Sequence, residues 1–201
     1  MLKIKEVQEK NKRFFDRAKR FYEFPFIKII NKFIHKRDLK EVPITPNSEI
    51  LDAGCGTGMF LELIHKKHSD ARLYGIDVSE KMLETAKKRL GGKATLSRKS
   101  VESLSYKNRF DFIFNIDSFH HYADQRKAMI NFYNALRKGG TLAIADFSLG
   151  CAGNWFFKHF EPANSRMYLK EEFRELFRKH GLKNIKQKRL GLFSLMTIGE
   201  K

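Results

Sequence analysis

The stretch ILDAGCGTGMF, residues 50–60, decides how the rest of this sequence is interpreted. A short apolar run containing one acid, Asp52, leads into three glycines at every second position, from Gly54 to Gly58. The apolar run is typical of a buried strand, and the residues after the glycines follow helical spacing. A glycine-rich turn between a strand and a helix lets a ligand contact the backbone directly, and it places the first N–H groups of the helix beside that ligand. The stretch therefore predicts a ligand site at the carboxyl end of the first strand.

Strands and helices alternate along the rest of the chain. Strands are predicted at 49–53, 71–77, 93–97, 110–116, 141–147, 182–190 and 193–201, and helices at 58–68, 79–90, 124–137 and 169–181. Two further helices are predicted within residues 1–40. The last two strands must be antiparallel, because a parallel crossover needs about a dozen residues or more. The pattern predicts an α/β fold: a doubly wound, mostly parallel seven-stranded sheet with an antiparallel last strand.

Local signals mark several helix ends. Ser79 and Asp124 are the predicted N-caps of the helices that follow them, and Pro25 suits the first position of a helix. Gly139 and Gly140 are predicted to end the helix at 124–137.

Composition limits the class of protein. With 201 residues, of which 42% are hydrophobic and 19 are Phe, the chain is long enough for one globular domain. No apolar run approaches the roughly 18 residues of a membrane span, and the first residues lack a signal-peptide core, which predicts a cytoplasmic protein. Two cysteines predict neither a disulfide framework nor a metal cluster.

The net charge of +17 is concentrated at the two ends of the chain. Residues 1–40 hold 13 Lys/Arg against 5 Asp/Glu, and residues 151–201 hold 11 against 5, whereas residues 41–150 hold 16 against 13. Basic ends favour an anionic partner such as nucleic acid, lipid headgroups or an acidic substrate. Solvated helix faces would give the same count, so both interpretations stay open.

A second acid narrows the kind of ligand. Asp77 ends the predicted strand at 71–77, 19 residues after Gly58. An acid at the tip of the second strand can accept hydrogen bonds from both hydroxyls of a ribose. The glycine spacing differs from the G-x-G-x-x-G of dinucleotide sites. Together these features favour a nucleoside ligand with a small anionic group.

Four stretches then resemble, in order and spacing, the motifs of class I S-adenosylmethionine-dependent methyltransferases: EILDAGCGTG (49–58), GIDVSEKMLETAKKRL (75–90), FDFIFNIDSFHHYAD (110–124) and ALRKGGTLAIADF (135–147). The resemblance is closest to the small-molecule, type 11-like branch that includes the ubiquinone/menaquinone-biosynthesis methyltransferases. FFDRAKRFYE (14–23) also resembles the N-terminal helix of that branch. The resemblance implies a Rossmann-like fold and a methyltransferase that uses S-adenosylmethionine and releases S-adenosylhomocysteine.

The resemblance also implies a set of cofactor-binding residues: Tyr22, Asp52, Gly54, Cys55, Gly56, Asp77, Val78, Met82, Ser100, Val101, Glu102 and Asn115. In this set Asp77 would hold the ribose, and Val78 with Met82 would flank the adenine. Ser100 replaces the acid that meets the adenine amino group in the family, which leaves adenine recognition to the Val101 backbone and Glu102.

Candidate catalytic residues follow the fourth strand. Asp117, His120 and His121 come directly after it, and histidine suits proton transfer near neutral pH. A base is needed only if the methyl acceptor must lose a proton, and packing or solvent contact is the ordinary alternative for each histidine. No metal is expected.

Two segments have no place in the sheet. Residues 11–37 carry Phe14, Ala18, Phe21 and Tyr22 along one face, and residues 148–168 include His159. Both are expected above the carboxyl ends of the strands, where they would form the acceptor pocket. The domains are then an N-terminal helical lid at 1–40 and a cofactor-binding domain at 41–201.

Three functions remain open. The first is methylation of a small, apolar or amphipathic acceptor, with an anionic membrane surface as a further partner and peripheral membrane attachment as a further location. The second is RNA methylation, which the basic ends favour. Against it, NIDSFHH (115–121) lacks the Asn/Asp-Pro-Pro-aromatic motif, and the chain has no Pro-Cys pair. The third is a non-catalytic protein that binds a nucleoside cofactor, or an NAD-dependent enzyme, although the glycine spacing is against NAD. The sequence names neither the acceptor nor the oligomeric state.

Overall fold

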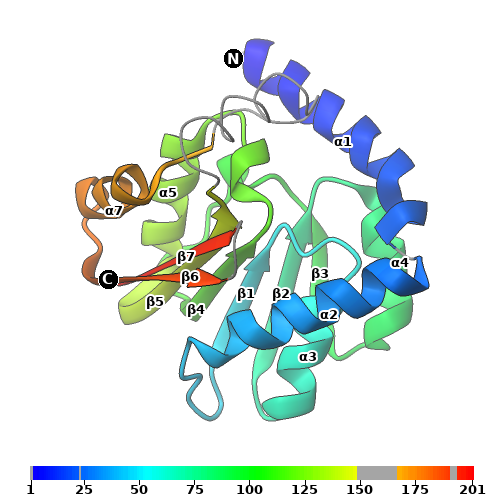
Figure 1. Ribbon diagram of the computed structural model, residues 1–201, viewed down its shortest axis with the longest axis horizontal. Coiled ribbons are helices and arrows are strands. Elements are labelled where there is room, and N and C mark those ends of the chain that lie inside the picture. Colours follow the sequence, from blue (N-terminus) through cyan, green and yellow to red (C-terminus); the bar gives the residue numbers. More distant parts are fainter. Residues whose placement is uncertain (1, 23, 149–166, 191–193) are drawn as a thin grey trace.

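The computed structural model describes residues 2–22, 24–148, 167–190 and 194–201 (Figure 1). Within the first two helices it does not describe the side chains of residues 2–5, 18–22, 25, 27, 28 and 30–32. The strands are β1 (Glu49–Ala53), β2 (Arg72–Asp77), β3 (Ala94–Arg98), β4 (Phe110–Ile116), β5 (Leu136–Phe147), β6 (Lys183–Leu190) and β7 (Ser194–Glu200). The helices are α1 (Leu2–Tyr22), α2 (Pro25–Lys40), α3 (Met59–Lys67), α4 (Glu80–Leu90), α5 (Gln125–Ala135) and α7 (Lys170–Lys179). Short 3-10 turns follow β3 and β4, at Val101–Ser103 and Phe119–His121.

The seven strands form one sheet in the order β3-β2-β1-β4-β5-β7-β6. Strands β1 to β5 pair in parallel, and β7 lies antiparallel between β5 and β6. The predicted doubly wound sheet and its antiparallel closing pair are therefore confirmed. The strand order reverses between β1 and β4, and this is the place where an open α/β sheet leaves a crevice at its carboxyl edge.

Helices cover both faces of the sheet (Figure 1). One core joins the sheet to α5 and α7 through fully buried aromatic rings such as Phe132 and Phe177. The other core joins it to α2, α3 and α4 through side chains such as Leu39, Ile64 and Leu90. Burial on both faces explains why β4 reads as a nearly continuous apolar run, FDFIFNI.

Local signals predicted some helix ends and missed another. The Ser79 hydroxyl accepts the N–H of Met82 at 3.2 Å, and the Asp124 carboxylate accepts that of Lys127 at 2.9 Å, so both predicted N-caps are confirmed. The prediction that α5 continues to 137 is wrong, because the helix ends at Ala135. Leu136 already pairs with Phe110 of β4, and the chain enters β5 five residues earlier than predicted.

The N-terminal residues form α1 and α2 as predicted, with Pro25 at the first turn of α2. Helix α1 crosses the carboxyl edge of the sheet, whereas α2 lies along α3 (Figure 1). A hydrogen bond of 2.6 Å from the Ser79 hydroxyl to Asp16 ties α1 to the beginning of α4. Among the described helices, none is long and apolar enough to cross a lipid bilayer.

Candidate active site

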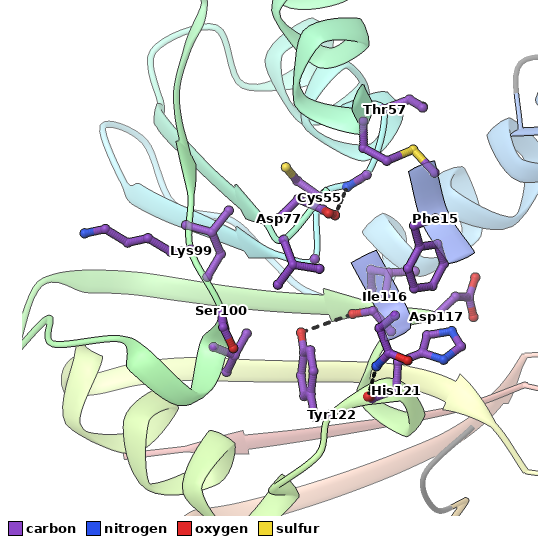
Figure 2. A pocket seen from close by; sticks show the side chains of 18 of the residues that line it. Phe15, Cys55, Thr57, Asp77, Lys99, Ser100, Ile116, Asp117, His121 and Tyr122 are labelled. Carbon is purple, nitrogen blue, oxygen red and sulfur yellow. Dashed lines mark hydrogen bonds between the residues drawn. The ribbon is translucent and has the colours of Figure 1, made fainter. Parts of the chain in front are cut away.

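A pocket opens at the carboxyl ends of β1, β2 and β4, beneath α1 (Figure 2). Counted out to its mouth, it contains about 1080 Å³ of space between protein atoms. This space includes solvent at the open mouth, and a concave site with mixed apolar and polar lining is typical of small-molecule binding. The pocket lies at the reversal of strand order, where the glycine-rich stretch was predicted to place it.

Gly56 gives the pocket a wall of bare backbone. Its φ of +50° belongs to the left-handed region, and a Cβ built on it would meet no protein atom within 4 Å. Its N–H points back into the protein and donates to the Asp77 carboxylate at 2.9 Å. The missing side chain therefore leaves room for a ligand rather than for another part of the fold.

The two neighbouring glycines serve the packing of the protein. A Cβ on Gly54 would lie 2.9 Å from the Cβ of Ser118, so this glycine lets the turn after β4 approach β1. A Cβ on Gly58 would lie 3.0 Å from the Cβ of Ala86, so this glycine lets α3 begin against α4. The three glycines of the opening stretch thus have three different physical roles.

Asp77 fixes the shape of the glycine turn. One carboxylate oxygen accepts the N–H of Gly56, and the other accepts the N–H of Ser79 at 2.8 Å. Burial raises the pKa of Asp77 to about 6, while the backbone N–H groups of Ser79, Gly56 and Val78 act in the opposite direction. A carboxylate offers about four acceptor positions, so these three N–H groups leave at least one for a hydroxyl group of a ligand.

Two predicted cofactor residues lie behind the pocket wall. Asp52 is 2% exposed, and burial followed by the charge of Asp77 raises its pKa to about 8. Asn115 is fully buried, and its side-chain amide contacts the carbonyl of Ala53 at 2.5 Å and the Tyr122 hydroxyl at 2.6 Å. The Asn115 side chain thus joins β1 to the turn after β4 and supports the wall. The family resemblance implies that the Asn115 backbone would meet the methionine amino group of the cofactor, and this side-chain contact does not test that prediction.

The 3-10 turn after β3 forms another part of the wall. Gln8 of α1 donates to the Ser100 hydroxyl at 3.1 Å, and that hydroxyl donates to the carboxylate of Glu102. The other carboxylate oxygen of Glu102 accepts the N–H of Ala123 at 3.0 Å. Glu102 therefore holds the turn after β4 in place as well as lining the pocket.

The histidine pair after β4 is divided between the pocket and the core. His121 lines the pocket, with the ring of Phe15 edge-on to it at 4.9 Å (Figure 2). His120 lies behind it, with the two ring centres 3.8 Å apart. The Nδ1 of His120 is 2.6 Å from Asp146 at the end of β5, and both side chains are 2% exposed. Asp146 thus fixes the orientation of the His120 ring.

Asp117 also lines the pocket, next to the histidine pair. Burial, followed by the negative charge of Asp146, raises the pKa of Asp117 to about 7. The protonation state of this carboxyl can therefore change near neutral pH, which is a property of groups that transfer protons.

Helix α1 closes the pocket from above through residues at helical spacing. Gln8, Asn11 and Phe15 line it, and the Asn11 amide donates to the backbone carbonyl of His121 at 2.6 Å. Phe14 was predicted on the face that forms the pocket, but Phe15 lines the pocket and Phe14 packs edge-on against it, with 5.2 Å between the ring centres. The helical spacing of residues 8, 11 and 15 is the sequence signal that marks this face.

The structure brings together most of the predicted site residues. The pocket is lined by Gly54, Cys55, Gly56, Asp77, Val78, Met82, Ser100, Val101, Glu102, Asp117 and His121. The side chains of Asp52, Asn115 and His120 do not line it. The side chain of Tyr22, and His159 with residues 149–166, lie outside the described part of the chain.

Several lining residues were not predicted: Gln8, Asn11, Phe15, His35, Thr57, Met59, Ile76, Lys99, Ile116, Ser118 and Tyr122. Ser118 and Tyr122 lie in the stretch FDFIFNIDSFHHYAD (110–124), and only the structure shows that they reach the pocket. Within the described residues, no group of three or more His, Cys, Asp or Glu side chains has a metal-binding arrangement.

Comparison with known proteins supports one family. Residues 50–140, a little under half of the chain, match a family described as a methyltransferase domain. This match supports a class I S-adenosylmethionine-dependent methyltransferase. The chain is 34% identical over 100 residues to malonyl-[acyl-carrier protein] O-methyltransferase 1 of Ilyobacter polytropus, a match that covers 49% of this chain and 37% of the relative. It is 27% identical over 192 residues to phosphoethanolamine N-methyltransferase of Plasmodium falciparum, covering 90% of this chain and 72% of the relative.

A solved structure shows the same fold over nearly the whole chain. It is a chain of the complex between the Haloferax volcanii Trm112 methyltransferase activator and a methyltransferase, with a TM-score of 0.79 and 18% identity. The match covers 92% of this chain and 96% of that chain. At this identity the likeness establishes the Rossmann-like fold. The first curated relative above is far longer, since this chain spans little more than a third of it.

Proposed function

We propose that the protein transfers the methyl group of S-adenosylmethionine to a small, apolar or amphipathic acceptor bound in the pocket beneath α1. The observation that carries this proposal is the pairing of Gly56 and Asp77. The Gly56 backbone, which has open space at its Cβ position, donates its N–H to the half-buried Asp77 carboxylate, with 2.9 Å between N and Oδ2. A nucleoside with two vicinal hydroxyls and no long phosphate chain matches this arrangement.

The residues around this pair fit the rest of the cofactor. Asp77 would accept the ribose hydroxyls, and Val78 with Met82 would contact the adenine from the pocket wall. The backbone at Gly54 to Gly56 would lie along the methionine portion. Asp52 lies behind the pocket wall. It would influence the methionine portion of the cofactor through its charge state rather than by direct contact.

The cofactor supplies an activated methyl group on a sulfonium, so the protein needs chiefly to hold the acceptor in line and to exclude water. Positioning of this kind can supply about 7–11 kcal/mol of a reaction barrier. Where the acceptor must lose a proton, His121 is the residue placed to take it, because it lines the pocket. His120, fixed by Asp146, would orient His121 from behind, and Asp117 offers a second titratable group.

Residues 1–40 would act as a lid in this reaction. The contacts of Gln8, Asn11 and Phe15 with the pocket, and of Asp16 with Ser79, support this role. A lid that excludes water strengthens every electrostatic interaction inside the pocket.

An apolar or amphipathic acceptor is supported by Phe15, Met59 and Ile116, which provide apolar surface in the pocket. The two relatives named above carry names with different acceptors, malonyl-[acyl-carrier protein] and phosphoethanolamine, and neither is an RNA. An RNA acceptor is therefore not favoured for this chain.

Calorimetry with S-adenosylmethionine, S-adenosylhomocysteine and NAD tests the cofactor. We expect binding of the first two and none of NAD, and we expect Asp77→Ala to weaken binding by about 1.5–3 kcal/mol, the value of a lost charged hydrogen bond. Glu84→Ala, an exposed change on α4, is the matched control and should bind normally. Normal binding by a folded Asp77→Ala protein would contradict the assigned site. Transfer itself is tested with a methyl-labelled cofactor and cell extract, followed by identification of the labelled product.

A further inference from the structure

The outer side of α2 exposes a group of large apolar side chains. Phe26, Ile29 and Phe33 are 69%, 68% and 71% exposed, and Phe24, just before the helix, is 65% exposed. Among the described residues, the only other large apolar side chain with comparable exposure is Ile130 of α5. The three helical residues recur at intervals of three and four, which places them on one face. We call this face, with Phe24, the outer face of α2.

The opposite side of the same helix is part of the folded core. Leu39 is 3% exposed, and the ring of His35 packs edge-on against Phe60 of α3 at 5.5 Å. Helix α2 is therefore held by its inner side, and its exposed outer face lies opposite these contacts. Apolar groups gathered on one exposed face mark an interaction surface more often than scattered single residues do.

Charge indicates what this surface binds. The sequence of α2 contains five Lys/Arg and a single acid, Asp38, and Asp38 is fully buried. The exposed stripe formed by Phe26, Ile29 and Phe33 continues at the same spacing into Lys36 and Lys40, both of which are exposed. The surface thus joins apolar side chains to positive charge without an exposed acid. An anionic lipid surface has the complementary chemistry, because its headgroups attract Lys while its acyl boundary accepts Phe and Ile.

We propose that the outer face of α2 docks on the surface of an anionic lipid bilayer. Phe24, Phe26, Ile29 and Phe33 enter the boundary between headgroups and acyl chains, and the basic end of the helix contacts lipid phosphates. The inner side of α2 lines the pocket through His35, so docking brings the pocket within about one helix diameter, 10–12 Å, of the lipid. Docking itself does not depend on the proposed methyl transfer.

Vesicle sedimentation tests the proposal with phosphatidylcholine vesicles, with and without phosphatidylserine. The wild-type protein should bind vesicles that contain phosphatidylserine and should be released as salt rises, because the Debye length shortens. The triple variant Phe26→Ser/Ile29→Ser/Phe33→Ser should bind at least tenfold more weakly. Ile130→Ser, which also removes an exposed apolar side chain, is the matched control and should bind like the wild type. Lys36→Glu/Lys40→Glu should remove the preference for phosphatidylserine.

Several results would overturn the proposal. One is a wild-type protein that binds neither kind of vesicle, and another is a triple variant that binds both kinds as the wild type does. A wild-type dimer in sedimentation velocity that the triple variant loses would assign the outer face to a second copy of the chain. Binding of single-stranded RNA that the triple variant loses, without vesicle binding, would assign it to nucleic acid. Calorimetry with S-adenosylmethionine on each variant reports separately on the fold and on the cofactor site.

Discussion

Replacing Gly56 by alanine should impair cofactor binding far more than it impairs folding. The structure provides a matched control in Gly91, which ends α4 and has nearly the same φ angle. Their φ angles are +50° and +53°, and a Cβ on either residue would meet no protein atom within 4 Å. Only Gly56 lines the pocket. Gly56→Ala and Gly91→Ala thus impose the same backbone strain and differ in what the new methyl group meets.

The two magnitudes follow from this geometry. An L-residue in the left-handed region costs about 1 kcal/mol of folding free energy. For a chain of this size, 1 kcal/mol lowers Tm by about 2–4 °C, and we expect this change in both variants. In Gly56→Ala alone, the methyl group occupies space that the cofactor needs. Forcing an extra methyl into a packed contact costs about 1–3 kcal/mol, so affinity should fall by roughly 5-fold to 150-fold.

Calorimetric titration with S-adenosylmethionine and thermal melting of the two variants provide the measurement. We expect equal Tm values, normal cofactor affinity for Gly91→Ala and weakened affinity for Gly56→Ala. Wild-type affinity in Gly56→Ala would refute the reasoning, because it would show that the cofactor does not approach this backbone. A much lower Tm for Gly56→Ala than for Gly91→Ala would show that the space at Gly56 belongs to the fold.

Three further changes test other parts of the site. The pKa of Asp52 is raised from 3.8 to about 8, so the folded state holds this proton more tightly than the unfolded state, and this carboxyl's contribution to the free energy of unfolding falls as pH rises from about 4 to about 8. Asp52→Asn should flatten that decline in urea titrations at pH 5 and pH 8, and an unchanged slope would show that Asp52 is not the cause. His121→Ala should lower turnover by about 100-fold with little change in cofactor affinity if the acceptor loses a proton to it, whereas full turnover on the true acceptor would leave positioning as the whole contribution. Ser79→Ala removes the N-cap of α4 and the hydrogen bond to Asp16, so it should lower the free energy of unfolding by about 1–2 kcal/mol, and an unchanged urea midpoint would show that water replaces both contacts.

Much of the fold was predictable because the signals are local. The apolar run before Gly54, the caps at Ser79 and Asp124 and the short link before β7 each act over a few residues, and the structure confirms them. The end of α5 was missed for the opposite reason. Leu136 leaves the helix because Phe110, which is 26 residues away in the chain, offers it a strand partner, and no signal within the helix itself shows this.

The sequence by itself determined the class of site. A strand, a turn of spaced glycines and an acid at the tip of the next strand specify a nucleoside pocket, because the carboxyl ends of neighbouring parallel strands must meet at one edge of the sheet. Only the tertiary structure decided which side chains share that pocket. Asn11 reaches the backbone of His121 across 110 residues, and Asp146 holds His120 in the core while His121 lines the pocket. Such contacts depend on how helices and strands pack together. The local periodicity of a sequence does not show which elements will pack against each other.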